Sequence, residues 1–326
     1  MSTKDKVLTF LEANRGQHIS GAKMAEELDV SRNAVWKAIK QLEKEGFKID
    51  AVTNKGYSLL KENNQLSEIG IRENLRTNFK DAPIHYFSTI DSTNKKAKEL
   101  ALEGATHGTL VVANEQTKGK GRYGRQFESP EDTGIYMSAV LKPKELSFND
   151  PTLVTAYAAV IVSRVIETLT GKQIGIKWVN DLFYENKKVC GILTEAVTDF
   201  ESGQIEWIVL GIGINLSTSE TTFSKEVREK AGSIFNSSET NISRNLLVAK
   251  IYEEIVKPSE ELSVDSMMQE YKNRSIVLNK QVIIQQGSKT YEVLIKDIDK
   301  AGQLVIETKE GETKTFNSGE IRIMLN

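Results

Sequence analysis

The sequence predicts an α+β protein built from three parts, and three observations support this. Short amphipathic helical patterns and a hairpin fill the first sixty residues. Longer helical patterns then mix with strand patterns, and short strands separated by glycine-containing turns complete the chain. Because 326 residues exceed what one hydrophobic core usually holds, we expect separate domains. The expected limits are 1–62, 66–272 and 273–326, with the polar stretch 61–65 as the first boundary.

Composition and charge exclude several classes of protein. Hydrophobic residues make up 39% of the chain and charged residues 27%, which is typical of a folded globular protein. The net charge of −2 excludes a basic field over the whole molecule, so any contact with DNA or phosphate must come from a local patch. A single cysteine, Cys190, excludes a disulfide framework and a cysteine-based zinc finger.

Two features of the sequence bear on cellular location. No apolar run approaches the length of about 20 residues that a membrane-spanning helix needs. The first residues have no secretory signal pattern. We therefore expect a cytoplasmic protein with no membrane partner.

The first sixty residues are typical of a winged helix-turn-helix. A helix is expected over 3–13, a second after the N-cap Ser20, and a third after the N-cap Ser31. The third helix has inward positions spaced by four and three, and Gly46 ends it. Two strands over 47–52 and 57–60 then enclose a four-residue turn, which is the size of a wing.

The outward face of the third helix and the hairpin tip suggest DNA contacts. Residues 31–58 hold six lysines or arginines and three acids, a local charge of +3. Most basic helix faces are merely solvated, but the ordered set of three helices, cap and basic hairpin favours DNA binding. The candidate DNA-binding residues are Ser31, Arg32, Asn33, Lys37 and Lys55.

Strand and helix patterns intermix in the middle of the chain. Because they do not alternate strictly, a mixed sheet is favoured over a doubly wound parallel one. Strands are expected over 84–87, 109–113, 135–141, 174–178, 188–194 and 205–215, and helices over 92–102, 152–169 and 244–256.

The stretch 116–125 combines glycines with cations. Its glycines match GxGxxG, but Pro130 soon follows and no acidic residue stands in the ribose position, which argues against a dinucleotide site. Cations alternate with the glycines, namely Lys118, Lys120, Arg122 and Arg125. Glycine lets the backbone approach a ligand closely, and the cations can neutralise phosphate or carboxylate oxygens. The alternative is a solvated basic loop.

Three further motifs accompany this loop. The run Lys177-Trp178-Val179-Asn180-Asp181 ends a strand, and a hairpin turn leads to the strand 188–193. The run 211–215 is apolar and glycine-spaced, so that it would admit a flat ligand. Asp91-Ser92-Thr93-Asn94 is a helix N-cap.

Together these motifs, in this order, resemble those of the biotin protein ligases, specifically the bifunctional type that also represses biotin genes. The resemblance covers the whole chain. It implies a central domain like those of biotin ligases and class II aminoacyl-tRNA synthetases, and a C-terminal SH3-like β-barrel. It also implies formation of biotinyl-5′-AMP from biotin and ATP with Mg²⁺, followed by biotin transfer to a lysine of a carrier domain.

The implied partners follow from this resemblance. They are the biotin carboxyl carrier domain of acetyl-CoA carboxylase or pyruvate carboxylase, operator DNA, and a second copy in a homodimer promoted by biotinyl-AMP as corepressor. Two other functions are weighed: a transcription factor that only senses biotin, and a ligase for lipoate or octanoate. The intact Lys188, Asp181 and Arg122 argue against a pure sensor. The winged helix and the Lys-Trp-x-Asn-Asp run argue against a lipoate enzyme.

By resemblance we assign the site residues, leaving metal ligands unassigned. Lys188, Asp181 and Arg122 are the expected catalytic residues: Lys188 contacts carboxylate and phosphate, Asp181 orients or deprotonates the incoming lysine, and Arg122 lies in the loop that closes over the adenylate. The expected biotin-binding residues are Ser92, Thr93, Asn94, Gln116, Gly119, Lys120, Gly121, Arg122, Lys188 and Gly191. The expected ATP- and adenylate-binding residues are Arg122, Arg125, Phe127, Lys177, Asn180 and Asn215.

The chain departs from the family pattern at three positions. Lys120 stands where the loop usually has arginine, which replaces a bidentate fork with a point charge. Val179 stands where proline is usual, so the strand end is less rigidly set. Phe127 replaces tryptophan, which keeps an aromatic face and loses an N–H donor.

The last part of the chain reads as short strands. They are expected over 276–278, 281–285, 290–298, 302–307, 312–316 and 320–324, with turns at 286–288, 300–302 and 310–312. The resemblance places this part beside the ligase site, so that Gly319 and Glu320 are expected to assist ATP or carrier binding.

Overall fold

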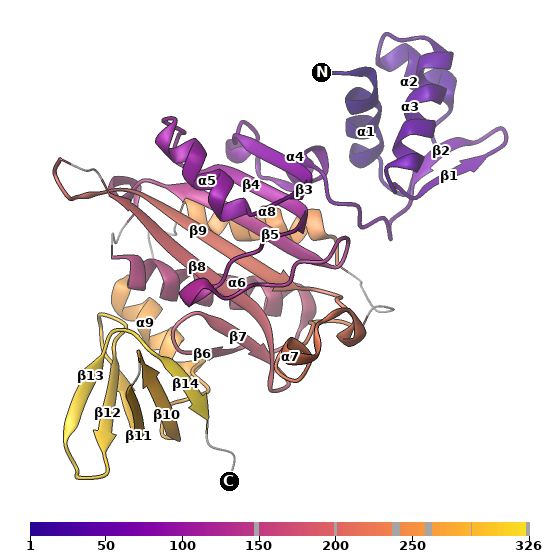
Figure 1. Cartoon of the computed structure of the whole chain (residues 1–326). Coiled ribbons are helices and arrows are strands. Elements are labelled where there is room, and N and C mark those ends of the chain that lie inside the picture. Colours follow the sequence, from indigo (N-terminus) through magenta and orange to yellow (C-terminus); the bar gives the residue numbers. More distant parts are fainter. Residues whose placement is uncertain (147–149, 199–200, 237–241, 258–262, 288, 324–326) are drawn as a thin grey trace.

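The computed structural model describes residues 1–326 except 147–149, 199–200, 237–241, 258–262, 288 and 324–326. Figure 1 shows three parts in chain order: a small helical part at the N-terminus, a large central sheet with helices, and a C-terminal sheet. This arrangement matches the predicted α+β class.

The N-terminal part is a winged helix. Its elements are α1 (Thr3–Ala13), α2 (Gly21–Glu27), α3 (Arg32–Lys44), β1 (Ile49–Val52) and β2 (Gly56–Leu59). Each helix begins after a serine whose hydroxyl accepts a backbone N–H bond, at Ser2, Ser20 and Ser31, so the predicted caps at Ser20 and Ser31 are confirmed. Gly46 has a φ of 89°, which only glycine adopts readily, and it turns the chain from α3 into the wing.

The winged helix has its own hydrophobic core. Val35, Ile39 and Leu42 of α3 are buried against Leu11 of α1 and Met24 of α2. Polar ties hold the segment that follows. Arg15 donates to the carbonyls of Leu60, Lys61 and Asn63. The polar linker 61–65 is thus held to the winged helix at its N-terminal end.

A seven-stranded mixed sheet forms the centre, in the order β3-β4-β5-β9-β8-β7-β6. Only β3 and β4 pair in parallel, and the other neighbours are antiparallel. The predicted mixed sheet is confirmed. The strands are β3 (Ile84–Ile90), β4 (Thr109–Gln116), β5 (Gly134–Leu141), β6 (Gly175–Lys177), β7 (Asp181–Tyr184), β8 (Lys187–Thr198) and β9 (Ile205–Asn215).

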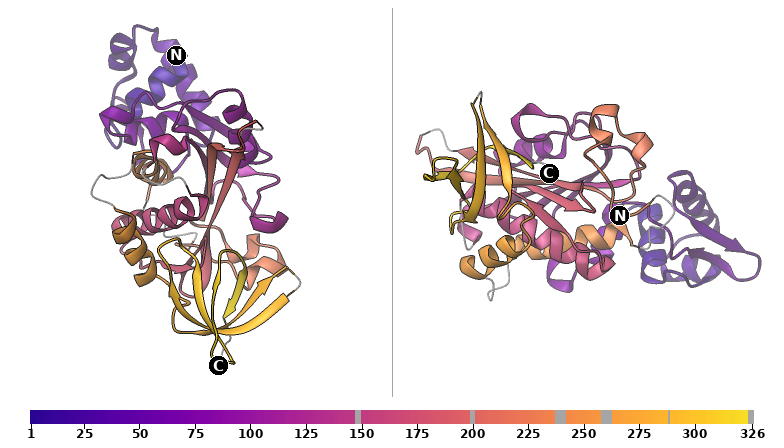
Figure 2. Two further views of the ribbon diagram at one scale, coloured as in Figure 1. Left: turned by 90° about the vertical axis from the view of Figure 1, so that its left-hand side faces the viewer. Right: turned by 90° about the horizontal axis from the view of Figure 1, so that it is seen from below.

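Helices cover both faces of this sheet (Figure 2). On one face α5 (Thr93–Leu102) packs Ala97 and Ala101 against the sheet residues Val111 and Val209. On the other face lie α6 (Pro151–Thr170), α8 (Arg244–Val256) and α9 (Val264–Asn273), and α4 (Glu68–Asn74) packs against α8. Short turns complete this part: η1 (Thr77–Phe79), η2 (Arg122–Gly124), η3 (Pro143–Glu145), η4 (Glu220–Thr222) and α7 (Lys225–Arg228).

Helix α6 corrects the expectation that no apolar run approaches the length of a membrane span. It has 20 residues, an apolar window of mean hydropathy 1.5, and the length to cross a bilayer. In the fold it is the central helix of the core, and 61% of that window is buried inside the molecule. Its apolar surface is therefore accounted for by packing against the sheet and α8.

The C-terminal part is a five-stranded antiparallel sheet in the order β13-β12-β11-β10-β14. Its strands are β10 (Gln281–Gln286), β11 (Lys289–Ile298), β12 (Leu304–Thr308), β13 (Thr313–Phe316) and β14 (Glu320–Ile323). The strand expected over 276–278 is wrong. The Ile276 N–H instead bonds the carbonyl of Ile176, because this segment ties the C-terminal part to β6.

Two hydrogen bonds hold the motif that follows β6, one to the C-terminal part and one from helix α9. The indole N–H of Trp178 donates to the carbonyl of Gly302 at 2.8 Å. The hydroxyl of Tyr271 in α9 donates to the carbonyl of Val179 at 2.9 Å. The strand end carrying Asn180 and Asp181 is consequently held from both sides.

Candidate functional site

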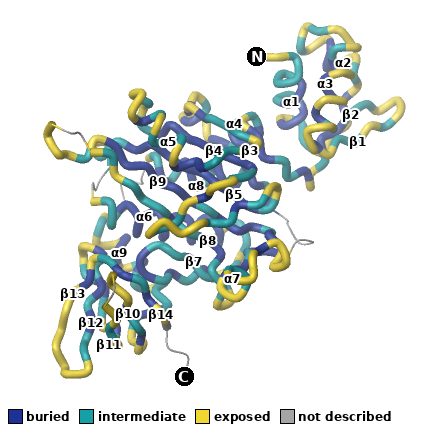
Figure 3. Tube along the Cα trace, viewed as in Figure 1, coloured by how far each residue is buried: buried dark blue, intermediate teal, exposed yellow. Residues whose placement is uncertain are grey.

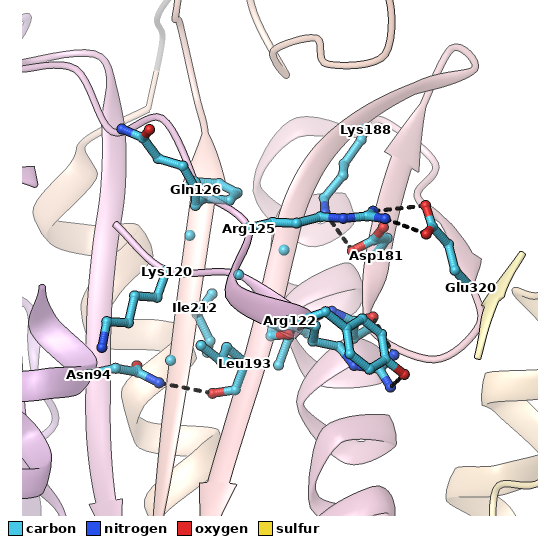
Figure 4. A pocket seen from close by; sticks show the side chains of 18 of the residues that line it. Asn94, Lys120, Arg122, Arg125, Gln126, Asp181, Lys188, Leu193, Ile212 and Glu320 are labelled. Atoms are coloured by element: carbon cyan, nitrogen blue, oxygen red, sulfur yellow. Dashed lines mark hydrogen bonds and ion pairs between the residues drawn. The ribbon is translucent and has the colours of Figure 1, made fainter. Parts of the chain in front are cut away.

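A cleft opens where the loop 119–127 crosses the central sheet beside β14 (Figure 4). It holds about 980 Å³ of empty space, part of it open to solvent. Its walls come from the start of α5, the loop, the β6–β7 turn, β8, β9 and the C-terminal sheet. Segments that lie more than 200 residues apart in the chain therefore form one site.

Most of the predicted ligand-binding and catalytic residues line this cleft. They are Ser92, Thr93, Asn94, Gln116, Lys120, Gly121, Arg122, Arg125, Phe127, Lys177, Asn180, Asp181, Lys188 and Gly191. Two others do not. Gly119 lies just behind the wall, where a Cβ would meet the carbonyl of Phe127 at 2.3 Å. Asn215 is buried at the end of β9 and donates to the carbonyl of Gly232.

One end of the cleft is a closed network of small polar groups. The N–H and hydroxyl of Thr93 both donate to Oε1 of Gln116, at 2.8 and 3.1 Å. The amide of Gln116 in turn donates to the hydroxyl of Ser129. Ser138, fully buried on β5, is within 2.8 Å of the Thr93 hydroxyl. These bonds fix donors and acceptors in space, as recognition of a small polar group requires.

Asn94 closes the bottom of the same end. Its amide donates to a carboxylate oxygen of Glu195 at 2.8 Å and to the carbonyl of Leu193 at 3.3 Å. Its side chain lies directly against Gly211, where a Cβ would be only 1.9 Å from Oδ1. Glycine at 211 is therefore required by the close approach of Asn94.

Glycines on two neighbouring strands support the Phe127 ring. A Cβ at Gly213 would meet Cε1 of Phe127 at 2.6 Å, and one at Gly191 would meet its Cε2 at 3.1 Å. Gly191 and Gly213 face each other across β8 and β9. We predicted that the 211–215 glycines admit a flat ligand, whereas here the flat group over Gly213 is the side chain of Phe127.

The loop is a compact hairpin, as its backbone bonds indicate. Lys120 and Gln126 bridge, and the Gly121 N–H donates to the carbonyl of Arg125 at 2.7 Å. Tyr123 at its tip has a φ of 57° and an exposed ring, with the Arg122 guanidinium 5.0 Å from the ring centroid. Arg122 also donates to the side-chain oxygen of Asn180 at 3.3 Å, which brings the loop to the β6–β7 turn.

Lys188 and Asp181 form an ion pair at the centre of the cleft. Its Nζ lies 2.6 Å from Oδ1 of Asp181, across the β7–β8 ladder (Figure 4). Both side chains are only partly exposed, so their charges are weakly screened. Nearby, burial lowers the pKa of Lys177, against the opposing pull of Asp181 and Glu320. A bound anion would offset that cost.

A second ion pair joins the loop to the C-terminal sheet. Arg125 donates to both carboxylate oxygens of Glu320 on β14, one bond measuring 2.8 Å. Hydrogen bonding to Glu320 raises the pKa of Arg125, and the same contact lowers the pKa of Glu320. The expected proximity of Glu320 to the site is confirmed, although its role in ATP or carrier binding stays a prediction.

The charges of the cleft favour an anionic ligand. Five cationic side chains and two carboxylates line it, an excess of three positive charges. Both carboxylates are engaged by cations. Within the described residues no cluster of three or more His, Cys, Asp or Glu side chains could hold a metal ion. Cys190 is buried in β8, and burial raises the pKa of its thiol.

Sequence reasoning missed several groups that complete the site. They are Ser129, Ser138, Glu195, Tyr123 and Gln126. No sequence signal marks Ser138 or Glu195, because single polar residues inside apolar strands carry no local pattern. Tyr123 could have been predicted, because it lies between Arg122 and Gly124 within the loop of glycines and cations.

The predicted DNA-binding residues belong to the winged helix, whose α3 and wing lie apart from the central sheet (Figure 3). Ser31 caps α3, Arg32, Asn33 and Lys37 lie on it, Lys55 lies in the turn between β1 and β2, and all five are exposed. The predicted outward face of α3 is therefore confirmed as a solvent-facing surface.

Comparison with protein families matches each part of the chain. Residues 3–58 match a helix-turn-helix domain, residues 86–215 the biotin/lipoate A/B protein ligase family, and residues 277–324 the biotin protein ligase C-terminal domain. The fold and the cation-rich cleft thus define a protein ligase of the biotin/lipoate class that carries a helix-turn-helix domain.

Full-length relatives narrow this class. The bifunctional ligase/repressor BirA of Bacillus spizizenii is 35% identical over 322 residues, 97% of each chain, and BirA of Escherichia coli is 27% identical over 97% of this chain and 96% of its own. The chain belongs to the bifunctional ligase/repressor family. A solved structure of biotin protein ligase from Aquifex aeolicus, in complex with biotin and ATP, is 27% identical, with a TM-score of 0.63 over 74% of this chain and 99% of that one.

Proposed function

We propose that this chain is an ATP-dependent biotin protein ligase and a biotinyl-AMP-dependent repressor of biotin synthesis or transport genes. The observation that carries the ligase half is the cleft, in which a network of small polar groups lies next to an anion site built around Lys188. Biotin has a planar ureido group at one end and a carboxylate at the other. The two ends of the cleft match these two groups.

In the first step, the biotin carboxylate attacks the α-phosphorus of ATP. A carboxylate oxygen–phosphorus bond forms, the bond to the β-phosphate bridging oxygen breaks, and pyrophosphate leaves. Lys188 neutralises the carboxylate and the charge that develops on the α-phosphate, as Lys177, Arg122 and Arg125 do for the remaining phosphates. Because Lys188 is paired with Asp181 in the free protein, it must turn from that carboxylate to the ligand.

In the second step, a lysine amine of the carrier domain attacks the acyl carbon of biotinyl-5′-AMP. A carbon–nitrogen bond forms, the bond between the acyl carbon and the phosphate oxygen breaks, AMP leaves, and the amine proton passes through Asp181 to solvent. Once Lys188 is engaged by phosphate, Asp181 is free to accept a hydrogen bond from the incoming amine and orient it. The loop 119–127, carrying Arg122, covers the adenylate and excludes water, because the mixed anhydride is hydrolysable.

The remaining roles follow the shape of the cleft. Ser92, Thr93, Asn94 and Gln116 hold the ureido end, while Lys120, Gly121 and Gly191 contact biotin and Phe127 and Asn180 contact the adenylate. For Gly119 and Asn215, which lie behind the wall, we propose support of the loop and of the β9 end in place of direct contact.

Magnesium enters this scheme as part of the substrate MgATP. The two carboxylates of the cleft already pair with cations, and the described residues offer no dedicated cluster of metal ligands. Mg²⁺ commonly binds through substrate phosphates and keeps several waters. When bound, it neutralises charge on the triphosphate.

The test of the ligase half is incubation with biotin, MgATP and a biotin carboxyl carrier domain from acetyl-CoA carboxylase or pyruvate carboxylase. We expect the carrier to gain the mass of biotin less one water at a single lysine. The same incubation with lipoate or octanoate should leave the carrier unchanged. A chain that binds biotin but transfers nothing is a sensor and contradicts the proposal.

The repressor half rests on the winged helix. Arg32, Asn33 and Lys37 occupy the N-terminal part of α3, the part of a recognition helix that meets base edges, and Lys55 is placed to contact phosphate from the wing. We propose that biotinyl-AMP promotes a homodimer, because two winged helices would then engage two operator half-sites together.

A double variant tests the repressor half of the proposal. Arg32→Ala combined with Lys37→Ala should abolish operator binding and leave biotin transfer unchanged, since both side chains are remote from the cleft. Light scattering should show dimer formation only with biotin and MgATP present. The proposal includes a cytoplasmic location and the domain limits 1–62, 66–272 and 273–326, inside which the three family matches fall.

A further inference from the structure

We infer that Trp36 is a specificity-determining residue of the repressor, and that its indole contacts the 5-methyl group of thymine in the major groove. This inference rests on the proposed repressor function and extends it. The chain has three tryptophans. Trp178 and Trp207 are 3% and 4% exposed in the core, whereas Trp36 is 49% exposed on α3.

The position of Trp36 within α3 places it among the proposed DNA-binding side chains. Helix α3 begins at Arg32, so Trp36 is its fifth residue and lies one turn beyond Arg32. Asn33 is three residues before it, and Lys40 is four residues after it. Trp36 therefore lies within the exposed stripe, on the side that borders the buried residues Val35 and Ile39.

Packing within the chain does not account for this indole. In the part of the molecule that the structure describes, Trp36 makes no hydrogen bond, aromatic contact or cation–π contact, and α3 already buries a full apolar face without it. Its neighbours Arg32, Asn33 and Lys37 likewise make no side-chain hydrogen bond or ion pair within the described residues. Arg32, Asn33 and Lys37 are thus exposed beside Trp36 with no polar partner within the described residues.

The chemistry of the DNA grooves selects the partner. The flanking cations Arg32 and Lys37 favour a polyanion, which fixes the surface as one that meets phosphate. Within the major groove the thymine methyl is the one apolar group on a base edge, and apolar side chains recognise it. An indole has a large apolar surface and a single N–H donor. It therefore matches the thymine methyl group better than it matches the paired hydrogen-bonding groups of the other base edges.

The test uses a duplex that the wild-type chain selects from a random pool in the presence of biotin and MgATP. Each thymine is then replaced in turn by deoxyuridine, which removes only the methyl group. We expect at least one replacement to weaken wild-type binding about fourfold, the free energy of one buried methyl. Trp36→Ala should bind the parent duplex more weakly and show no further loss on that replacement, whereas Trp36→Phe should keep part of the sensitivity.

Lys37→Ala is the matched control on the same helix face. It should lower the dependence of affinity on salt by about one phosphate contact and retain the full deoxyuridine effect, while Trp36→Ala should leave the salt dependence unchanged. Acrylamide quenching gives an independent reading, because the exposed tryptophan is Trp36: the selected duplex should protect it from the quencher. Unchanged far-ultraviolet circular dichroism and an unchanged Tm verify that the winged helix of Trp36→Ala is folded, because this part has its own hydrophobic core and biotin transfer would not report its loss.

Two results would overturn the inference in distinguishable ways. If the wild-type chain selects a sequence but no deoxyuridine replacement matters, or if Trp36→Ala responds to the replacement as wild type does, the indole does not recognise thymine and the repressor function stands. If the wild-type chain selects no sequence over random DNA, the proposed repressor function fails, and the inference fails with it.

Discussion

Arg125 of the cleft loop and Glu320 of β14 form a bidentate ion pair that connects two parts of the chain 195 residues apart. Glu320 also lines the cleft, and its carboxylate pairs with the guanidinium of Arg125, which we assign to binding the ATP phosphates. The loop is therefore held near the site by an anion that the substrate must displace.

Replacing Glu320 should improve ATP binding, which is opposite to an assisting role in ATP binding and follows from its pairing with Arg125. Glu320→Gln should lower the KM for MgATP about two- to fivefold, since exposed ion pairs are worth about 0.2–1 kcal/mol and the competitor is removed. Arg125→Ala should raise that KM, and adding Glu320→Gln to it should have no further effect. Steady-state kinetics on the four chains completes the cycle, and a raised KM in Glu320→Gln would refute the competition.

Lys188→Ala should remove adenylate formation while the fold persists. The loss of a cation at the developing charge predicts a fall in pyrophosphate release of about 10²–10³-fold. Lys187→Ala is the matched control, because Lys187 points out of the cleft to the carbonyl of Arg228. Equal pyrophosphate release from Lys188→Ala and wild type would contradict the assigned role.

Arg122→Gly should weaken the cover over the adenylate. Its guanidinium joins the loop to Asn180, so its loss should let biotinyl-AMP escape and label lysines of bystander proteins. Lys118→Gly, at an exposed position outside the cleft, should keep labelling on the carrier. Mass spectrometry of a mixture of carrier and serum albumin measures both, and labelling confined to the carrier in Arg122→Gly would count against the covering role.

Gly213→Ala should displace the ring of Phe127. The added Cβ would lie 2.6 Å from that ring, and such overpacking costs about 1–3 kcal/mol. We expect weaker ATP binding, measured by calorimetry, with partial recovery in Gly213→Ala combined with Phe127→Leu. No recovery in the double variant would mean that the ring is not what the methyl group meets.

Glu12→Gln should stabilise the winged helix at neutral pH. Burial raises the pKa of Glu12, against the opposing effect of Arg15, so its ionised form is less favourable in the fold than in the unfolded chain. That cost is present at pH 7 and disappears as the pH falls below the ordinary value of 4.5. Calorimetry should therefore show a higher Tm for Glu12→Gln at pH 7 and no difference at pH 4, with the exposed Glu62→Gln unchanged at both.

The elements with strong local signals were predictable from the sequence. Serine caps, the 3.6-residue apolar period and the turn residues predicted α1, α2, α3, α5, α6 and α8 with ends within one or two residues. The short helix α4, helix α9 and strand β7 were not predicted, although α2 and α5 are as short as these two helices. The strand expected over 276–278 failed because three apolar residues fit either a strand or a tie to β6.

The sequence by itself determined the motifs and the residue types of the site. Glycine, lysine and arginine at a fixed spacing can be recognised along the chain without knowing which segments pack together. Only the tertiary structure decided which of them meet. It paired Lys188 with Asp181 across a ladder, brought Glu320 to Arg125, and placed Asn215 behind the wall. Such contacts depend on strand register and on the docking of separate sheets, and these are set by long-range packing of the core.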